Sequence, residues 1–424
     1  MKATELKKII EDGGLSKYKN LYRDLDLQKE RFLSAVDSFV RYYGDGRDIE
    51  VFSVPGRTEI SGNHTDHNGG CVIAGSIDRD IIAIAAKNDE GIIRIHSEGY
   101  PEDVVKLSET DDAKNFKNFS SRALIGGMAA AFSRAGHTVG GYDAYVTSDV
   151  LKGSGLSSSA AYEVMIGNIL NHLYSDGEVS NVEIAKYAQY AENEYFGKPS
   201  GLMDQLACAV GGFVYIDFED PKDPQIEPVS FSLSDVGYAL CIVNTHGDHA
   251  DLNDDYAAVP GEMKAVAKLL GRDVLRGLTE EEIIKNFSNI RRVVGDRAVL
   301  RAFHFLRENE RVKKIKSALL SGDFAAFLGE VSESARSSFE FLQNVFTPSK
   351  VREQSVALTL ALSEGYLSGK SAVARVHGGG FAGTIQVFLK EEDAQGYTNY
   401  INSVLGDGSA SVYTVRDKGA VRLF

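Results

Sequence analysis

The chain has 424 residues, 43% of them hydrophobic and 25% charged, and its formal net charge is −14. This length predicts two domains, and the acidic excess argues against nucleic acid or an anionic membrane surface as a partner. Three widely spaced cysteines, at positions 71, 208 and 241, fit neither a disulfide framework nor a zinc motif. The sequence has no apolar signal-peptide core and no apolar run of membrane-spanning length. We therefore expect a cytoplasmic location; a monomer is our expectation as well, although no motif in the sequence indicates it.

The first 44 residues predict helices that pack on the body of the protein. Phe32, Val36, Phe39 and Tyr43 recur at helical spacing. A strand is then expected over 51–54, ended by the Pro-Gly pair that follows it.

A polar segment, residues 56–70, lies between stretches predicted as strands, 71–74 and 81–86. It contains Arg57, Asp66 and two histidines. An arginine suits phosphate charge and an aspartate suits sugar hydroxyls. The simpler interpretation is a loop closed by an Asn-Gly hairpin turn.

A glycine- and serine-rich loop, 152–161, reads Lys-Gly-Ser-Gly-Leu-Ser-Ser-Ser-Ala-Ala between a predicted strand, 142–150, and a predicted helix, 162–173. Its glycines allow a ligand close to the backbone, and N–H groups at a helix start attract anions. The serines can cap the helix, bond phosphate or ligate a hard cation. Neither the P-loop nor the dinucleotide-binding motif is present. A serine-capped helix without a ligand is the alternative.

Two carboxylates follow in unfavourable settings. Glu192 lies near the C-terminal end of a helix predicted over 182–195, where the helix dipole calls for a compensating cation. Solvation is the alternative for this glutamate. Asp204 lies among apolar residues, 202–208, and is costly there unless it is paired. It is therefore either a structural cap or a functional base.

The C-terminal half begins after a turn-rich connector near residues 220–224. His246, Asp248 and His249 do not have the spacing of a closed metal site. The sequence His-Gly-Gly-Gly at 377–380 resembles the oxyanion loop of lipases, but no G-x-S-x-G follows it, which disfavours a hydrolase. The elements expected here are a strand at 238–243, helices from 261 to 368, and strands at 372–376 and 384–389 around a glycine loop at 378–383.

Three of these segments, in this order, resemble the motifs of the GHMP (galactokinase/homoserine/mevalonate/phosphomevalonate) kinase superfamily. Residues 56–70 are similar to the galactokinase signature G-R-x-N-L-I-G-E-H-T-D-Y-N-G-G, residues 155–160 to the serine loop, and residues 378–383 to G-G-G-F-G-G. Residues 191–205 also resemble the galactokinase segment that ends in G-I-M-D-Q. The chain is thereby identified as a member of the galactokinase branch, from about residue 30 to its end.

The resemblance implies a mixed α/β (α+β) fold of two domains. A ribosomal-S5-like N-terminal domain is expected over 1–220 and a ferredoxin-like C-terminal domain over 235–424, with the active site between them. The implied activity is phosphorylation of the anomeric C1 hydroxyl of a galactose-type sugar by ATP with Mg²⁺.

By the same resemblance, Asp204 is the general base and Arg57 lies between the sugar and the γ-phosphate. Ser159 and Glu192 are the implied Mg²⁺ ligands. The Mg²⁺ ion would then be the cation that Glu192 needs. The ATP phosphates are assigned to Gly153, Ser154, Gly155, Leu156, Ser157, Ser158 and Ser159, and the sugar to Asn63, His64, Asp66, Gly201 and Tyr256.

The first motif departs from the galactokinase signature. The glutamate before His-Thr-Asp is Asn63, the tyrosine is His67, and Asn-Leu-Ile is residues 59–61, Glu-Ile-Ser. The third motif has His377 for threonine and Ala382 for glycine. Since the signature glutamate binds the 6-hydroxyl end of the sugar, a C6-modified sugar such as galacturonate, read by Asn63, is an alternative substrate. A non-catalytic sugar sensor on the same fold is another alternative, although the complete serine loop disfavours it.

Overall fold

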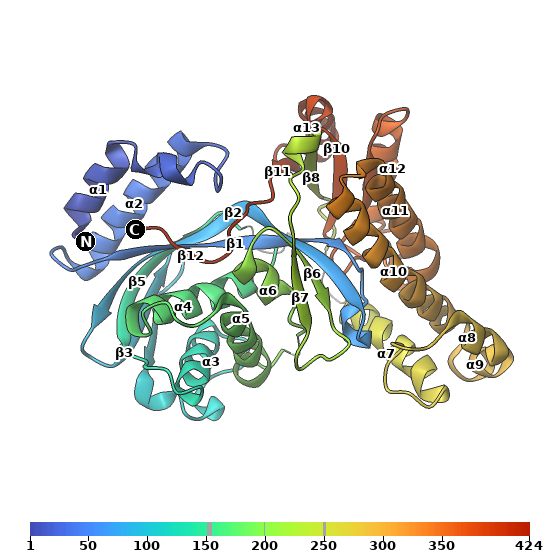
Figure 1. Cartoon of the computed structure of the whole chain (residues 1–424), viewed down its shortest axis with the longest axis horizontal. Helices are drawn as coiled ribbons and strands as arrows, with labels where there is room; N and C mark the ends of the chain where they lie inside the picture. Colours follow the sequence, from blue (N-terminus) through green and yellow to red (C-terminus); the bar gives the residue numbers. More distant parts are fainter. Residues whose placement is uncertain (151–154, 199, 249–251) are drawn as a thin grey trace.

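The computed structural model describes residues 1–150, 155–198, 200–248 and 252–424. Within these ranges eight strands form the first sheet, in the order β12-β1-β2-β5-β3-β4, with β6 paired to β2 and β7 to β6 (Figure 1). All neighbours are antiparallel except β3 and β5. The strands are β1 (Glu50–Ser61), β2 (Cys71–Asn88), β3 (Ile92–Ser97), β4 (Asp103–Lys106), β5 (Gly141–Ser148), β6 (Phe213–Asp217), β7 (Gln225–Val229) and β12 (Val421–Arg422).

A long hairpin of β1 and β2 forms the centre of this sheet. The expectation that the first strand ends at Pro55 is wrong, because β1 continues to Ser61 through a β-bulge between Pro55 and Arg57. A bulge tolerates the missing proline N–H. The two short strands expected over 71–74 and 81–86 are likewise one strand, β2. The bulge brings the backbone against the serine loop, where the Arg57 N–H donates to the Leu156 carbonyl over 3.0 Å.

Helices cover both faces of the first sheet (Figure 1). Successive residues of β2 point to opposite faces. Ile82 and Ile84 pack with the N-terminal helices, whereas Ile81 and Ala83 pack with the larger core on the other side. The N-terminal helices pack on the body as predicted. They are α1 (Ala3–Glu11) and α2 (Leu25–Tyr43), and the opposite face carries α3 (Ser121–Arg134), α4 (Ser158–Tyr174), α5 (Asn181–Tyr190) and α6 (Met203–Val210).

A buried ionic cluster joins the two ends of the chain to the first sheet. Asp80 on β2 accepts hydrogen bonds from Arg31 of α2 at 2.7 Å and from the Tyr22 hydroxyl at 2.7 Å. Arg416, near the C-terminus, lies 3.3 Å from the same carboxylate. This cluster holds the N-terminal helices against the first sheet. The sequence pattern did not indicate it.

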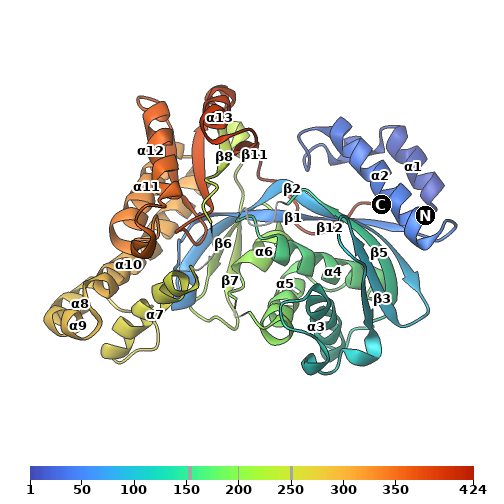
Figure 2. The same cartoon turned by 180° about the vertical axis from the view of Figure 1, so that it is seen from behind.

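The remaining described strands form a second, antiparallel sheet in the order β11-β8-β10-β9. Figure 2 shows its strands β8 and β11 at the end of the molecule that carries α10 to α13. The strands expected in this region are confirmed to within one or two residues. They are β8 (Tyr238–Asn244), β9 (Val373–His377), β10 (Thr384–Lys390) and β11 (Ala410–Tyr413). The helices are α7 (Asn253–Leu269), α8 (Glu280–Lys285), α9 (Phe287–Val294), α10 (Asp296–Ser321), α11 (Phe324–Ser337), α12 (Ser355–Leu367) and α13 (Glu391–Leu405).

Side chains of α12 and α13 form one core with the second sheet, and side chains of α10 and α11 pack on its other face. The chain then returns to the first sheet, where β12 pairs with β1. None of the helices in the described ranges has the length and apolar character needed to span a membrane.

Candidate active site

Arg57 and Asp204 form an ion pair where three predicted motifs meet. Arg57 follows the bulge in β1, and Asp204 lies in the first turn of α6. The guanidinium donates twice, from Nε to Oδ1 over 2.7 Å and from Nη2 to Oδ2 over 2.8 Å. Its remaining nitrogen, Nη1, donates to the Gly155 carbonyl, and the Ser157 hydroxyl donates to Asp204.

This arrangement determines the protonation of Asp204. Burial alone would raise its pKa, but the charge and hydrogen bonds of Arg57, helped by Ser157, bring the pKa below its usual value. The Asp204 side chain is 33% exposed, whereas that of Arg57 is 9% exposed. The site therefore holds an ionised carboxylate that is still accessible to a ligand.

The serine loop leads directly into α4. Ser157 precedes the helix with φ of 56°, an uncommon left-handed conformation for a residue other than glycine. Its side chain does not cap the helix, because the hydroxyl donates to Asp204 instead. The first N–H groups of α4 thus have no cap from this serine, and the positive end of the helix dipole lies beside the ion pair. Gly153 and Ser154, also assigned to phosphate, lie outside the described residues.

Glu192 lies on a π-helical segment, Ala191–Phe196, that continues α5. The single helix expected over 182–195 is therefore wrong in its last turn, since α-helical hydrogen bonding ends at Tyr190. Glu192 is 2% exposed. Its Oε1 lies 2.9 Å from Lys198 Nζ, and its Oε2 accepts from Gln205 Nε2 over 2.8 Å. The sequence predicted a cation that compensates the charge of Glu192, and in this structure that cation is the ammonium of Lys198.

Glu163 is a third carboxyl group of this region that the sequence analysis missed. It is fully buried on α4, and Oε2 accepts from Gln205 Nε2 over 3.2 Å. Within the described part of the chain its Oε1 has no hydrogen-bond partner. Burial, reinforced by the charge of Glu192, raises its pKa well above the usual value, which favours the protonated, neutral form of the group. Glu163 is the one charged residue in the stretch 160–170, and this was the available signal.

The loop after β1 carries the residues predicted to contact a sugar. Asp66 faces Gly201 so closely that a Cβ on this glycine would lie 2.8 Å from Oδ2 of Asp66. His64 Nε2 lies 2.9 Å from the carbonyl oxygen of Gly379, and the Tyr256 hydroxyl donates to the Gly380 carbonyl over 2.9 Å. The first motif, Tyr256 and the third motif therefore lie together.

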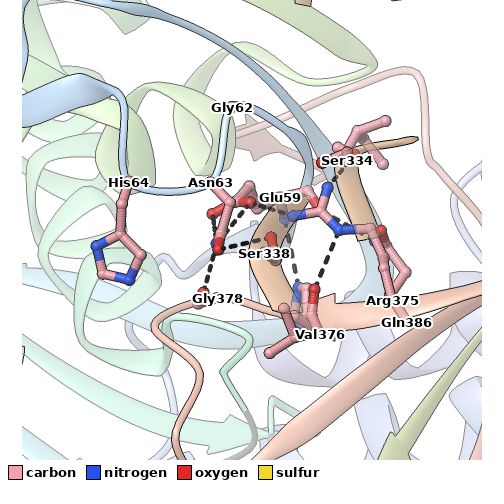
Figure 3. A network of polar contacts seen from close by, with 12 residues as sticks. Glu59, Gly62, Asn63, His64, Ser334, Ser338, Arg375, Val376, Gly378 and Gln386 are labelled. Atoms are coloured by element: carbon pink, nitrogen blue, oxygen red, sulfur yellow. Dashed lines mark hydrogen bonds and ion pairs between the residues drawn. The ribbon is translucent and has the colours of Figure 1, made fainter. Parts of the chain in front are cut away.

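Asn63 belongs to a buried polar network between the two sheets (Figure 3). Its Nδ2 donates to the Gly378 carbonyl over 2.7 Å and to Glu59 Oε1 over 3.2 Å, and its Oδ1 accepts from Asn344 Nδ2 over 2.7 Å. The side chain is completely buried. In the same view His64 points away from this network. The carboxamide of Asn63 is thus used within the protein.

Arg375, on β9, joins the third motif to the first (Figure 3). It is fully buried and donates to Glu59 Oε1 over 2.8 Å and to the Ile60 carbonyl over 2.7 Å. His377 lies beside it, with Nε2 3.0 Å from the Thr58 hydroxyl. Burial lowers the pKa of His377 well below its usual value, so it is a neutral hydrogen-bonding residue. Sequence spacing could not indicate either partnership.

Two family models match separate parts of the chain. Residues 123–212 match the GHMP kinases N terminal domain, and residues 37–87 match the galactokinase galactose-binding signature. The galactokinase of Streptomyces coelicolor is 32% identical over 356 residues, which cover 83% of this chain and 87% of the relative. That of Thermotoga petrophila is 32% identical over 337 residues, covering 80% and 88%.

Solved structures show the same fold. Lactococcus lactis galactokinase complexed with galactose superposes with a TM-score of 0.77 at 24% identity, covering 92% of this chain and all of that one. A mevalonate kinase gives a TM-score of 0.60 at 15% identity, covering 87% and 99%.

Fold and motifs together define a small-molecule kinase of the GHMP class, and the predicted fold class is confirmed. Within that class the chain belongs to the galactokinase branch. It is a sugar kinase, as the resemblance implied.

Proposed function

We propose that this sugar kinase transfers the γ-phosphoryl group of ATP to the anomeric C1 hydroxyl of a galactose-type sugar. The observation that carries the proposal is the bidentate Arg57–Asp204 pair beside the serine loop. A carboxylate kept ionised there can accept a hydroxyl proton, while the arginine faces the charge that develops on the transferred group.

In this mechanism Asp204 accepts the proton of the C1 hydroxyl as the sugar oxygen bonds to the γ-phosphorus. The bond from that phosphorus to the ADP oxygen breaks at the same time. Phosphoryl transfer has a loose transition state, so positioning and charge neutralisation supply most of the catalysis. Arg57 suits positioning because its hydrogen bonds to Asp204 and to the Gly155 carbonyl hold the carboxylate beside the serine loop. It suits charge neutralisation because its guanidinium is a fixed positive charge at this position.

ATP phosphates would lie on the serine loop and the first turn of α4. The uncapped helix start and the hydroxyls of Ser158 and Ser159 are the supporting features. Gly155, Leu156 and Ser157 complete the described part of this site, and we also assign Gly153 and Ser154, which lie outside the described residues.

Mg²⁺ fits the donors beside this loop. Among the described residues no cluster of three or more histidine, cysteine or acidic side chains could hold a metal alone. Mg²⁺ commonly takes one or two carboxylates together with substrate phosphates and water. Glu192 already attracts a cation, Lys198, and Ser159 adds a hydroxyl. We assign Mg²⁺ to Glu192 and Ser159, where the ion would neutralise phosphate charge.

On the sugar side we assign Asp66, His64, Gly201 and Tyr256. Asp66 Oδ2 and the Gly201 backbone face each other, which suits hydroxyls that both donate and accept. We assign Asn63 to support of the loop, because its amide atoms already bond to protein partners. A monomeric, cytoplasmic protein stays our prediction.

A non-catalytic sugar sensor is the competing proposal, and ADP release tests the two. We expect ADP release from Mg-ATP that requires a galactose-type sugar and is lost in Asp204→Asn. Sugar and nucleotide binding without ADP release would instead favour the sensor.

A further inference from the structure

Three departures from the galactokinase signature change charged or proton-binding groups in the first motif, residues 56–70, which comprises the end of β1 and the loop after it. Glu59 replaces asparagine, Asn63 replaces glutamate, and His67 replaces tyrosine. The first two exchange a carboxylate and an amide, and these groups still hydrogen-bond to each other over 3.2 Å. The carboxylate of the signature is therefore not lost but lies four residues earlier, on β1.

In its new position the carboxylate offers no negative charge to a ligand. Glu59 is 4% exposed and lies 2.8 Å from the fully buried Arg375. With Glu59 ionised the pair is neutral, and with Glu59 protonated it is positive. Asn63 is neutral and buried. The position that holds a carboxylate in the signature thus holds none here.

His67 adds a positive charge, as counting protons along a hydrogen-bonded chain shows. His64 Nε2 lies 2.9 Å from the Gly379 carbonyl oxygen, His64 Nδ1 lies 3.2 Å from His67 Nε2, and His67 Nδ1 lies 2.9 Å from Asp66 Oδ1. A carbonyl and a carboxylate only accept, so each outer nitrogen carries a proton. The contact between His64 Nδ1 and His67 Nε2 requires a third proton, carried by one of these two nitrogens. Three protons on two imidazoles make the pair a monocation.

The charge belongs mainly to His67. Burial and the neighbouring His67 lower the pKa of His64 to about 4. For His67, burial is outweighed by Asp66, and the pKa is raised. The pKa of Asp66 is lowered to about 2, since the histidines outweigh burial. Other charged or titratable groups near the pair are Lys264 on α7, Glu59 and His304. The His67 side chain is 32% exposed, but both of its ring nitrogens face protein partners, Asp66 and His64, so it would act on a ligand through its charge and not through a hydrogen bond.

With Glu59 paired to Arg375, the first motif as a whole is therefore less negative than the signature. The signature combines a glutamate and an aspartate, whereas this motif combines Asp66 with a histidine cation beside it and an exposed lysine nearby. A neutral sugar gains nothing from this exchange, but a sugar with a negative charge does.

We propose that the substrate is an acidic sugar, a galactose-type hexose with a carboxylate at C6, and that His67 is the residue that selects it. The proposal rests on the proposed function and narrows its substrate class. It assigns the selection to the cation of His67, not to Asn63.

The test is ADP release from Mg-ATP by the full-length protein with galactose and with galacturonate, in wild type and in His67→Tyr. We expect wild type to favour galacturonate in kcat/KM by at least about tenfold, as a net charge contact would give. Restoring the signature tyrosine should remove that preference, because kcat/KM for galacturonate should fall by more than kcat/KM for galactose. His67→Asn, which is smaller and neutral, should act like the tyrosine variant, and His137→Tyr, a histidine outside the site, should change nothing.

The preference should also weaken with rising pH, because the cation is present below the raised pKa of His67 and is lost above it. A wild type that favours galactose would overturn the acidic-sugar proposal and leave the sugar kinase proposal standing. A preference for galacturonate that survives both folded His67 variants would overturn the role of His67. ADP release with neither sugar would overturn the proposed function itself.

Discussion

Asp204→Asn is the perturbation that bears most directly on the mechanism. The variant keeps the shape of the side chain and one acceptor oxygen for Arg57. It removes the negative charge that accepts the proton, and it turns an amide N–H₂ toward a guanidinium that now lies 2.7 and 2.8 Å from the carboxylate oxygens.

Loss of a general base typically lowers a rate by about 10²- to 10⁴-fold, which is roughly 3–5 kcal/mol of activation free energy. A second cost falls on stability, because the buried Arg57 loses its charged partner. Removing one member of a charged hydrogen bond costs about 1–3 kcal/mol, and since Asp204 is 33% exposed we expect the lower part of that range.

Steady-state ADP release gives kcat and KM, and thermal unfolding checks that the variant is folded. Asp143→Asn is the matched control. Asp143 accepts from Arg47 over 2.6 Å and Arg94 over 3.1 Å, and it lies on β5 at the end away from the serine loop. We expect this control to lose stability and keep kcat. If folded Asp204→Asn turns over within about tenfold of wild type, the general-base role is wrong.

Three further predictions concern the neighbouring charges. Arg57→Lys should lower kcat by at least about tenfold with little change in KM, because lysine cannot donate in a bidentate fork; an unchanged kcat in steady-state ADP release would contradict this. Lys198→Met should lower the Mg²⁺ concentration for half-maximal ADP release, since Lys198 competes for Glu192; an unchanged or higher requirement would refute the competition. Glu163→Gln should be active and should lose less stability than wild type as pH rises, measured by thermal unfolding. Because the pKa of Glu163 is raised in the folded state, the unfolded state releases the Glu163 proton at lower pH, and the stability of the wild type falls above the usual glutamate pKa. If the stabilities of wild type and Glu163→Gln changed in parallel with pH, folding would not raise this pKa.

Much of the site follows from local sequence because its chemistry is local. Glycines and serines before an apolar helix predict an anion site wherever they occur, and Ser157 lies where this pattern placed it. An aspartate among apolar residues must find a partner, and Asp204 finds Arg57, 147 residues away. The need for a partner can be predicted from the sequence, but its identity came only from the family resemblance.

Other features depend on contacts that no spacing rule encodes. Asn63 and Asn344 are 281 positions apart, and their hydrogen bond exists only because the two sheets meet. A proline normally ends a strand, yet β1 passes Pro55 because a bulge sits beside it. The π-helical turn at Glu192 and the ammonium of Lys198 on that carboxylate likewise come from tertiary packing.

The most direct test of the central claim is the position of the phosphate in the product. The purified chain should be incubated with Mg-ATP and galactose or galacturonate, and the product examined by phosphorus and proton NMR. We predict a phosphoester on the anomeric carbon, seen as coupling between phosphorus and the C1 proton. A phosphoester on any other hydroxyl, or no phosphorylated sugar from a folded protein that binds both substrates, would contradict the account.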